Sequence, residues 1–114
     1  MATLEGVNKT NFQINTRFWR LLTNLIFDKC GDLIKDNERQ GWHENYGKMI
    51  SAETARQIAN RLERLIEQGI VERYEVELEI ANLKPYFTRE ILTKFIRFCK
   101  GSGGFDIFGD IQNL

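Results

Sequence analysis

The chain contains few of the residues from which small proteins build metal sites or disulfide frameworks. Among its 114 residues are two cysteines, one histidine and one proline. The cysteines are too few for the scaffold of a disulfide-rich secreted domain, and together with the histidine they lack the short spacings of a zinc site. No apolar run approaches the roughly 18 residues of a membrane span, and the N-terminus has no apolar signal core. We therefore expect a cytoplasmic protein with reduced thiols, no metal and no membrane contact.

The chain also lacks an excess of charge of one sign. Sixteen basic residues balance sixteen acidic residues, so the net charge does not require a nucleic acid or an anionic membrane as a partner. Hydrophobic residues make up 42% and charged residues 28%, as in ordinary soluble globular proteins. The length predicts one domain over residues 1–114.

Apolar residues recur every three or four positions over much of the chain, a spacing that predicts helices. The first helix is expected to begin near Arg17, with Asn15 or Thr16 as its N-cap, and to end between residues 31 and 36. Residues 37–50 show no such period and contain two glycines, which predicts a loop.

The most regular apolar stripe predicts a helix over about residues 52–68, opened by Ser51 and closed by Gly69 in a left-handed conformation. Residues 71–82 fit either a helix or a strand, and their glutamates favour the helix. A last helix ends at Gly101. Together these segments predict an all-α fold: a single compact domain of about four helices, a small helical bundle with a short extended C-terminal segment.

A glycine-rich segment, KGSGGFDIFGD, follows this last helix at residues 100–110. A phosphate-binding loop places its glycines before a helix, where backbone amides and the helix dipole attract an anion. Here the glycines come after a helix, at the negative end of its dipole. We therefore predict a structural turn and no bound nucleotide or other cofactor. In this turn Gly101 is a left-handed helix cap, Gly103 and Gly104 reverse the chain, and Phe105, Ile107 and Phe108 return to the core.

Another candidate site is the segment GWHENYG, residues 41–47, which contains the only histidine. A histidine beside a glutamate can carry out acid–base catalysis, and tryptophan and tyrosine are frequent hot-spot residues of protein interfaces. The segment can therefore be the active site of a small enzyme, a partner-binding surface, or a loop whose aromatic residues anchor it on the core. Its candidate binding residues are Trp42, His43, Glu44, Asn45 and Tyr46.

Charge is segregated along the C-terminal half of the chain. Residues 63–79 carry six glutamates against two arginines, a net charge of −4, and residues 84–100 carry five basic residues against one glutamate, a net charge of +4. Either two antiparallel helices pair these charges across the surface, or the two patches steer a charged protein partner.

The segment SAETARQIANRLERLIEQGIVERYEVELEI, residues 51–80, resembles the recognition helix and the following wing strand of winged-helix DNA-binding regulators. The resemblance implies a helix surface that reads base edges and phosphates. Such a fold also needs a helix shortly upstream, where the sequence predicts a loop. The candidate DNA-binding residues are Arg56, Gln57, Asn60, Arg61 and Arg64.

A second resemblance covers more of the chain. FWR near the start, N-x-G-x-x-I-S-x-x-x-A-x-x-I-A in the middle, and a phenylalanine-rich segment ending in S-G-G-F-x-I are similar to a group of small uncharacterised bacterial and phage proteins. The matching residues are Trp19, Asn45, Gly47, Ile50, Ser51, Ala55, Ile58, Ala59, Phe87, Phe95, Phe98, Ser102, Gly103, Gly104, Phe105 and Ile107. The resemblance implies a helical fold and a structured C-terminal turn, and it implies no particular activity.

These observations lead us to expect a non-catalytic protein-binding or regulatory module, monomeric or weakly dimeric, whose partner is another protein. One alternative is a winged-helix-like DNA-binding transcriptional regulator. The other is a small enzyme that uses the segment around His43.

Overall fold

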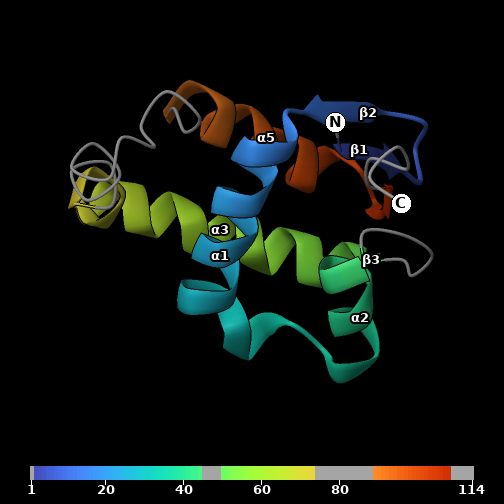
Figure 1. Cartoon of the computed structure of the whole chain (residues 1–114), viewed down its shortest axis with the longest axis horizontal. Helices are drawn as coiled ribbons and strands as arrows, with labels where there is room; N and C mark the ends of the chain where they lie inside the picture. Colours follow the sequence, from blue (N-terminus) through green and yellow to red (C-terminus); the bar gives the residue numbers. More distant parts are fainter. Residues whose placement is uncertain (1, 45–49, 74–88, 109–114) are drawn as a thin grey trace.

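The structure, a computed structural model, describes residues 2–44, 50–73 and 89–108, without the side chains of residues 40, 41, 43 and 44. Two strands open the chain, β1 (Ala2–Gly6) and β2 (Asn11–Ile14), followed by helix α1 (Thr16–Cys30), the 3-10 turn η1 (Gly31–Leu33) and helix α2 (Asp36–Glu44). The chain continues with the short strand β3 (Ile50–Ser51), helix α3 (Ala52–Glu67), helix α5 (Arg89–Gly101) and strand β4 (Gly104–Phe108) (Figure 1).

Four of these elements form an antiparallel sheet in the order β2-β1-β4-β3. The fold is therefore mixed α/β, and the prediction of an all-α helical bundle is wrong. The polar N-terminal segment forms a hairpin, and the segment expected to be merely extended after α5 is the strand that pairs with β1. Each strand has at most five residues, which is too few for an alternating pattern to stand out in the sequence.

The sheet turns one face towards the helices, where a cluster of aromatic residues fills the core. Leu4 and Ile107 are fully buried on this face, and exposed or half-buried residues alternate with them along the strands. Trp19 and Trp42 stack with their ring centroids 5.8 Å apart, and Phe105 packs edge-on against Trp42 at 5.9 Å. The predicted return of Phe105 and Ile107 to the core is therefore confirmed, whereas Phe108 is only half-buried.

Helices α1 and α3 begin where their capping residues predict. The side-chain oxygen of Asn15 accepts a hydrogen bond from the N–H of Arg17 at 2.8 Å, and the hydroxyl of Ser51 accepts one from the N–H of Thr54 at 3.2 Å. Gly69 follows α3 with a φ of +74°, the left-handed conformation expected there. Local signals were sufficient for these two helices because each has a wide apolar stripe and a capping residue.

The oppositely charged segments pack antiparallel, with ion pairs between them. Glu63 on α3 pairs with Lys100 near the end of α5, and Glu72 pairs with Arg89 at its start, where the nitrogen and oxygen lie 2.8 Å apart. Glu63 comes before Glu72 in the chain, whereas its partner Lys100 comes after Arg89, so the two segments run in opposite directions. These two ion pairs agree with the predicted pairing across the surface, and residues 74–88 of the two charged segments lie outside the described residues.

Helix α2 occupies most of the segment for which a loop was predicted, residues 37–50, so that prediction is wrong. Among the described side chains of α2, only Glu38 and Trp42 are buried, and they lie one turn apart. Two buried positions, one of them a carboxylate, do not make an apolar stripe that periodicity can detect. Of the ambiguous segment 71–82, residues 71–73 are helical and the rest lies outside the described residues.

The glycine turn after α5 is held by the loop between β1 and β2. Gly103 and Gly104 have φ angles of +71° and +98°, whereas Gly101 is the last helical residue and has no positive φ, so the prediction of a left-handed cap at Gly101 is wrong. The helix can continue to Gly101 because the side-chain amide of Asn8 donates a hydrogen bond to its carbonyl. The N–H of Val7 donates to the carbonyl of Gly104 at 2.9 Å.

Candidate functional site

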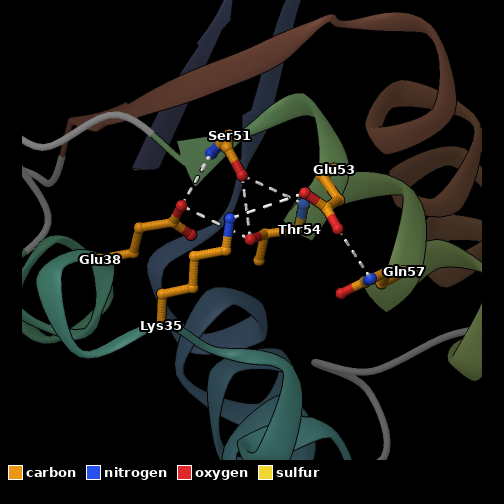
Figure 2. Close-up of polar contacts among 6 residues, drawn as sticks. All are labelled: Lys35, Glu38, Ser51, Glu53, Thr54 and Gln57. Carbon is orange, nitrogen blue, oxygen red and sulfur yellow. Dashed lines mark hydrogen bonds and ion pairs between the residues drawn. The ribbon is translucent and has the colours of Figure 1, made fainter.

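A buried carboxylate connects α2 to the first turn of α3 (Figure 2). Glu38 is 3% exposed, and its Oε1 accepts hydrogen bonds from the N–H of Ser51 at 3.2 Å and from the hydroxyl of Thr54 at 3.4 Å. The free N–H groups at a helix N-terminus carry partial positive charge, so an anion is favoured at this position. Glu38 therefore fixes the start of α3 against α2.

Two buried polar atoms near this junction have no hydrogen-bond partner among the described residues: Oε2 of Glu38, an acceptor, and Nε1 of Trp42, a donor. Nearer the surface, Lys35 forms an ion pair with Glu53 at 3.8 Å, and Glu53 accepts a hydrogen bond from Gln57 at 3.4 Å (Figure 2). The side chains drawn in Figure 2 include no thiol or imidazole. In the described part of the chain, no group of three or more histidine, cysteine or acidic residues could hold a metal ion. We interpret the cluster as a structural junction.

The segment 41–47 is divided between helix α2 and residues that the structure does not describe. Trp42 is 2% exposed and lies in the core, where the anchoring alternative predicts it, so it offers no surface to a partner. His43 and Glu44 are the last residues of α2, and their side chains are not described. Asn45 and Tyr46 lie outside the described residues.

The candidate DNA-binding residues lie on α3, but their central member is bound within the protein. Arg56, Gln57, Asn60 and Arg64 are exposed. Arg61 donates two hydrogen bonds of 3.0 Å to the carboxylate of Asp32 and one of 2.9 Å to the carbonyl of Lys29. Its guanidinium therefore joins α3 to the end of α1, and the hydrogen bond lowers the pKa of Asp32. Helix α2 lies upstream of α3, but it ends at Glu44 and strand β3 (Ile50–Ser51) stands between the two helices, unlike the short turn of a helix-turn-helix.

Both cysteines are buried, which opposes a role as nucleophiles. Burial raises the pKa of the Cys30 thiol to about 11 and that of the Cys99 thiol well above its usual range. A thiol attacks as the thiolate, so burial and the raised pKa oppose attack by either group at neutral pH.

Strand β2 presents unpaired main-chain groups, because it lies at the edge of the sheet and pairs only with β1 among the described strands. The N–H of Gly6 donates to the carbonyl of Thr10 at 2.7 Å. Gly6 and Thr10 are therefore a hydrogen-bonded pair of opposite residues. Leu4 lies opposite Phe12, two residues away from this pair on each strand. Because hydrogen-bonded pairs alternate with non-hydrogen-bonded pairs in an antiparallel ladder, Phe12 directs its N–H and C=O towards β1.

Asn11 and Gln13 are the neighbours of Phe12 on either side along β2. They therefore direct their N–H and C=O groups away from β1. No hydrogen bond from the described residues reaches these four groups, and both residues are exposed. We call the four groups the β2 edge. It supplies two donors and two acceptors in the arrangement that an added strand requires.

The side chains of β2 do not protect this edge. Natural edge strands are commonly protected by a charged residue, a proline or a bulge, and the sequence Asn-Phe-Gln-Ile has neither a charge nor a proline. Phe12 is half-buried and contacts Phe95 and Phe98, with ring centroids 6.1 and 5.7 Å away. Polar main-chain groups and a partly exposed aromatic ring thus lie side by side. Sequence reasoning missed the β2 edge because the strand itself was not recognised.

No protein-family model, curated protein or solved structure matches the chain. Within the described residues, no helix has the length and apolar character that crossing a membrane requires. The geometry of the side chains and main chain therefore carries the functional argument.

Proposed function

We propose that this protein is a non-catalytic protein-binding module that accepts an extended segment of a partner protein at the β2 edge. One observation carries the proposal: no described residue pairs with the outward N–H and C=O groups of Asn11 and Gln13, on an edge strand that has no charge or proline. A partner strand that satisfies these groups extends the sheet by one strand, a recognised mode of protein–protein binding.

The energetics favour a moderate affinity with some selectivity for sequence. Each of the four main-chain hydrogen bonds contributes about 1 kcal/mol net. The partner's side chains on the core side meet the half-buried ring of Phe12, so an apolar residue is favoured there. On the opposite face they meet the amide side chains of Asn11 and Gln13, so polar residues are favoured.

The enzymatic alternative has less support among the described residues. The carboxylate of Glu38 accepts hydrogen bonds from the start of α3, and both thiols are buried. These three groups, Glu38 and the two cysteines, are therefore part of the protein interior.

The proposal is tested by capture of partners from the native host with the wild-type protein, Gln13→Pro and Gln13→Ala as baits, followed by mass spectrometry. Proline removes the outward N–H of Gln13, and edge strands tolerate proline where that N–H faces solvent. Alanine removes the same side chain and keeps the N–H. We expect a partner that binds the wild type and Gln13→Ala and is lost with Gln13→Pro.

Circular dichroism and melting temperature of each bait must first show that the fold is retained. A partner that binds all three baits equally would contradict the proposal, because its binding would not need the β2 edge.

A further inference from the structure

We infer that the β2 edge also pairs with the β2 edge of a second copy of this chain, forming a symmetric dimer in which two sheets join into one. The inference rests on the proposed function because it uses the same main-chain groups. It goes further by naming one occupant, and it predicts an association that purified protein shows without any other partner.

The geometry of β2 allows one symmetric antiparallel register that uses all four free groups. In this register a two-fold axis passes between Phe12 and Phe12 of the second copy, and Asn11 lies opposite Gln13 of the second copy. Asn11 and Gln13 then exchange N–H and C=O bonds with their opposite residues, because their groups already point outward. Closed two-fold pairing of identical surfaces is the commonest form of protein oligomer.

Charge supports a second copy as the occupant. Like charges placed directly opposite each other destabilise a strand pair. The symmetric register places no charged residue of β2 opposite another, because Asn-Phe-Gln-Ile is uncharged, and Lys9 in the preceding loop lies opposite Asn15. The net charge of the whole chain is zero, so two copies do not repel each other at long range.

Phe12 supplies apolar contact at the centre of this interface. Its ring is half-buried against Phe95 and Phe98, and the two-fold axis brings it beside Phe12 of the second copy. In the non-hydrogen-bonded pairs of an antiparallel ladder, opposite side chains lie closest together. The two rings therefore cover surface that water contacts in the single chain.

The experiment measures mass against protein concentration by sedimentation equilibrium for the wild type, Gln13→Ala and Gln13→Pro. We expect a reversible dimer for the wild type and Gln13→Ala. Proline at this position removes one donor from each copy, and thus two hydrogen bonds from the dimer, so its dissociation constant should rise by about thirtyfold, equivalent to about 2 kcal/mol. The backbone amides of Asn11 and Gln13 should become slower to exchange with deuterium as the wild-type concentration rises.

A pair of double variants tests the register. Asn11→Lys with Gln13→Lys places like charges opposite each other in both symmetric pairs and should weaken the dimer. Asn11→Lys with Gln13→Glu places opposite charges there and should restore it. Equal effects of the two double variants would overturn the register and with it the inference.

The result also separates the two proposals. A wild type that is monomeric at every concentration, or a dimer unaffected by Gln13→Pro, would overturn the second copy as occupant. Partner capture that depends on the outward N–H of Gln13 would still support the proposed function in either case.

Discussion

Three neighbouring glycines in the turn after α5 should respond to alanine substitution in three different ways. At Gly104, φ is +98°, and an added Cβ would lie 2.7 Å from the carbonyl oxygen of Ile50 and 3.0 Å from the nitrogen of Ala52. Both neighbours are main-chain atoms at the junction of β3 and α3, so they cannot rotate away. The chain has glycine here because β4 and that junction approach each other closely.

The expected cost at Gly104 has two parts. A positive φ costs a residue with a Cβ roughly 1–2 kcal/mol, and overpacking against backbone costs about 1–3 kcal/mol. Gly104→Ala should therefore reduce the free energy of unfolding by about 2–5 kcal/mol, which lowers Tm by roughly 8–20 °C in a domain of this size. These values are a large part of the total stability of a typical domain.

The other two glycines serve as controls. Gly103 has a φ of +71°, but its added Cβ would meet only the Cβ of Val7 at an ordinary 3.7 Å, so Gly103→Ala should cost about 1–2 kcal/mol. Gly101 is helical and an added Cβ would meet nothing within 4 Å, so Gly101→Ala should raise stability by about 0.5–1 kcal/mol.

The assay is thermal and urea unfolding followed by circular dichroism, with near-native helix content required of each variant before unfolding. The informative result is the order of stabilities: Gly101→Ala above wild type, then Gly103→Ala, then Gly104→Ala. A loss of stability for Gly101→Ala equal to that of Gly104→Ala would refute the reasoning. It would show that Gly101, at the end of the helix, is a position that requires glycine.

Three further predictions concern the candidate sites. Trp42→Ala should lower the free energy of unfolding by about 3–5 kcal/mol, since the side chain is buried against Trp19, and a variant of unchanged Tm would show that Trp42 is not a core anchor. Asp32→Asn should be less stable than the wild type at neutral pH. Because Arg61 lowers the pKa of Asp32, the pair stabilises the fold above the ordinary aspartate pKa, and this contribution disappears as the pH falls through the lowered value. The free energies of unfolding of the wild type and Asp32→Asn should therefore become equal in acid. A difference that persists there would argue against the ion pair as its cause. Finally, we expect no measurable binding of duplex DNA in gel-shift assays at moderate salt, whereas micromolar binding that is lost on replacing Arg56 and Arg64 would favour the DNA-binding alternative.

Helices could be predicted from the sequence where their stability is encoded locally. Helix α3 has a hydroxyl cap at Ser51, a wide apolar stripe and a left-handed glycine at Gly69, and all three signals lie within about twenty residues of chain. Helix α2 is different, because its burial depends on Glu38 reaching Ser51 and on Trp42 stacking against Trp19. Those contacts join parts of the chain that a local window cannot bring together.

The sheet could not be predicted for a related reason. Strand β1 is stabilised by β4, whose pairing residues lie about a hundred positions away in the sequence, as Thr3 opposite Phe108 shows. The hairpin has a weak turn signal, since its loop uses Lys9 at a φ of +69° where glycine or asparagine is usual. The candidate β2 edge depends on this sheet, so the sequence alone could not indicate it.

The composition of β2 both concealed the strand and supports the proposed function. Asparagine is depleted in strands, and neither asparagine nor glutamine belongs to the β-branched and aromatic residues that mark them, so Asn-Phe-Gln-Ile reads as part of a polar start. An edge strand that only had to stay unpaired would gain from a lysine or proline at position 11 or 13, where no main-chain hydrogen bond to a described residue would be lost. The chain has neutral amides at both positions, and an amide side chain can both donate and accept hydrogen bonds. Neutral amides leave the main-chain groups of the β2 edge accessible, and replacing Gln13 by proline or alanine tests whether these groups bind a partner.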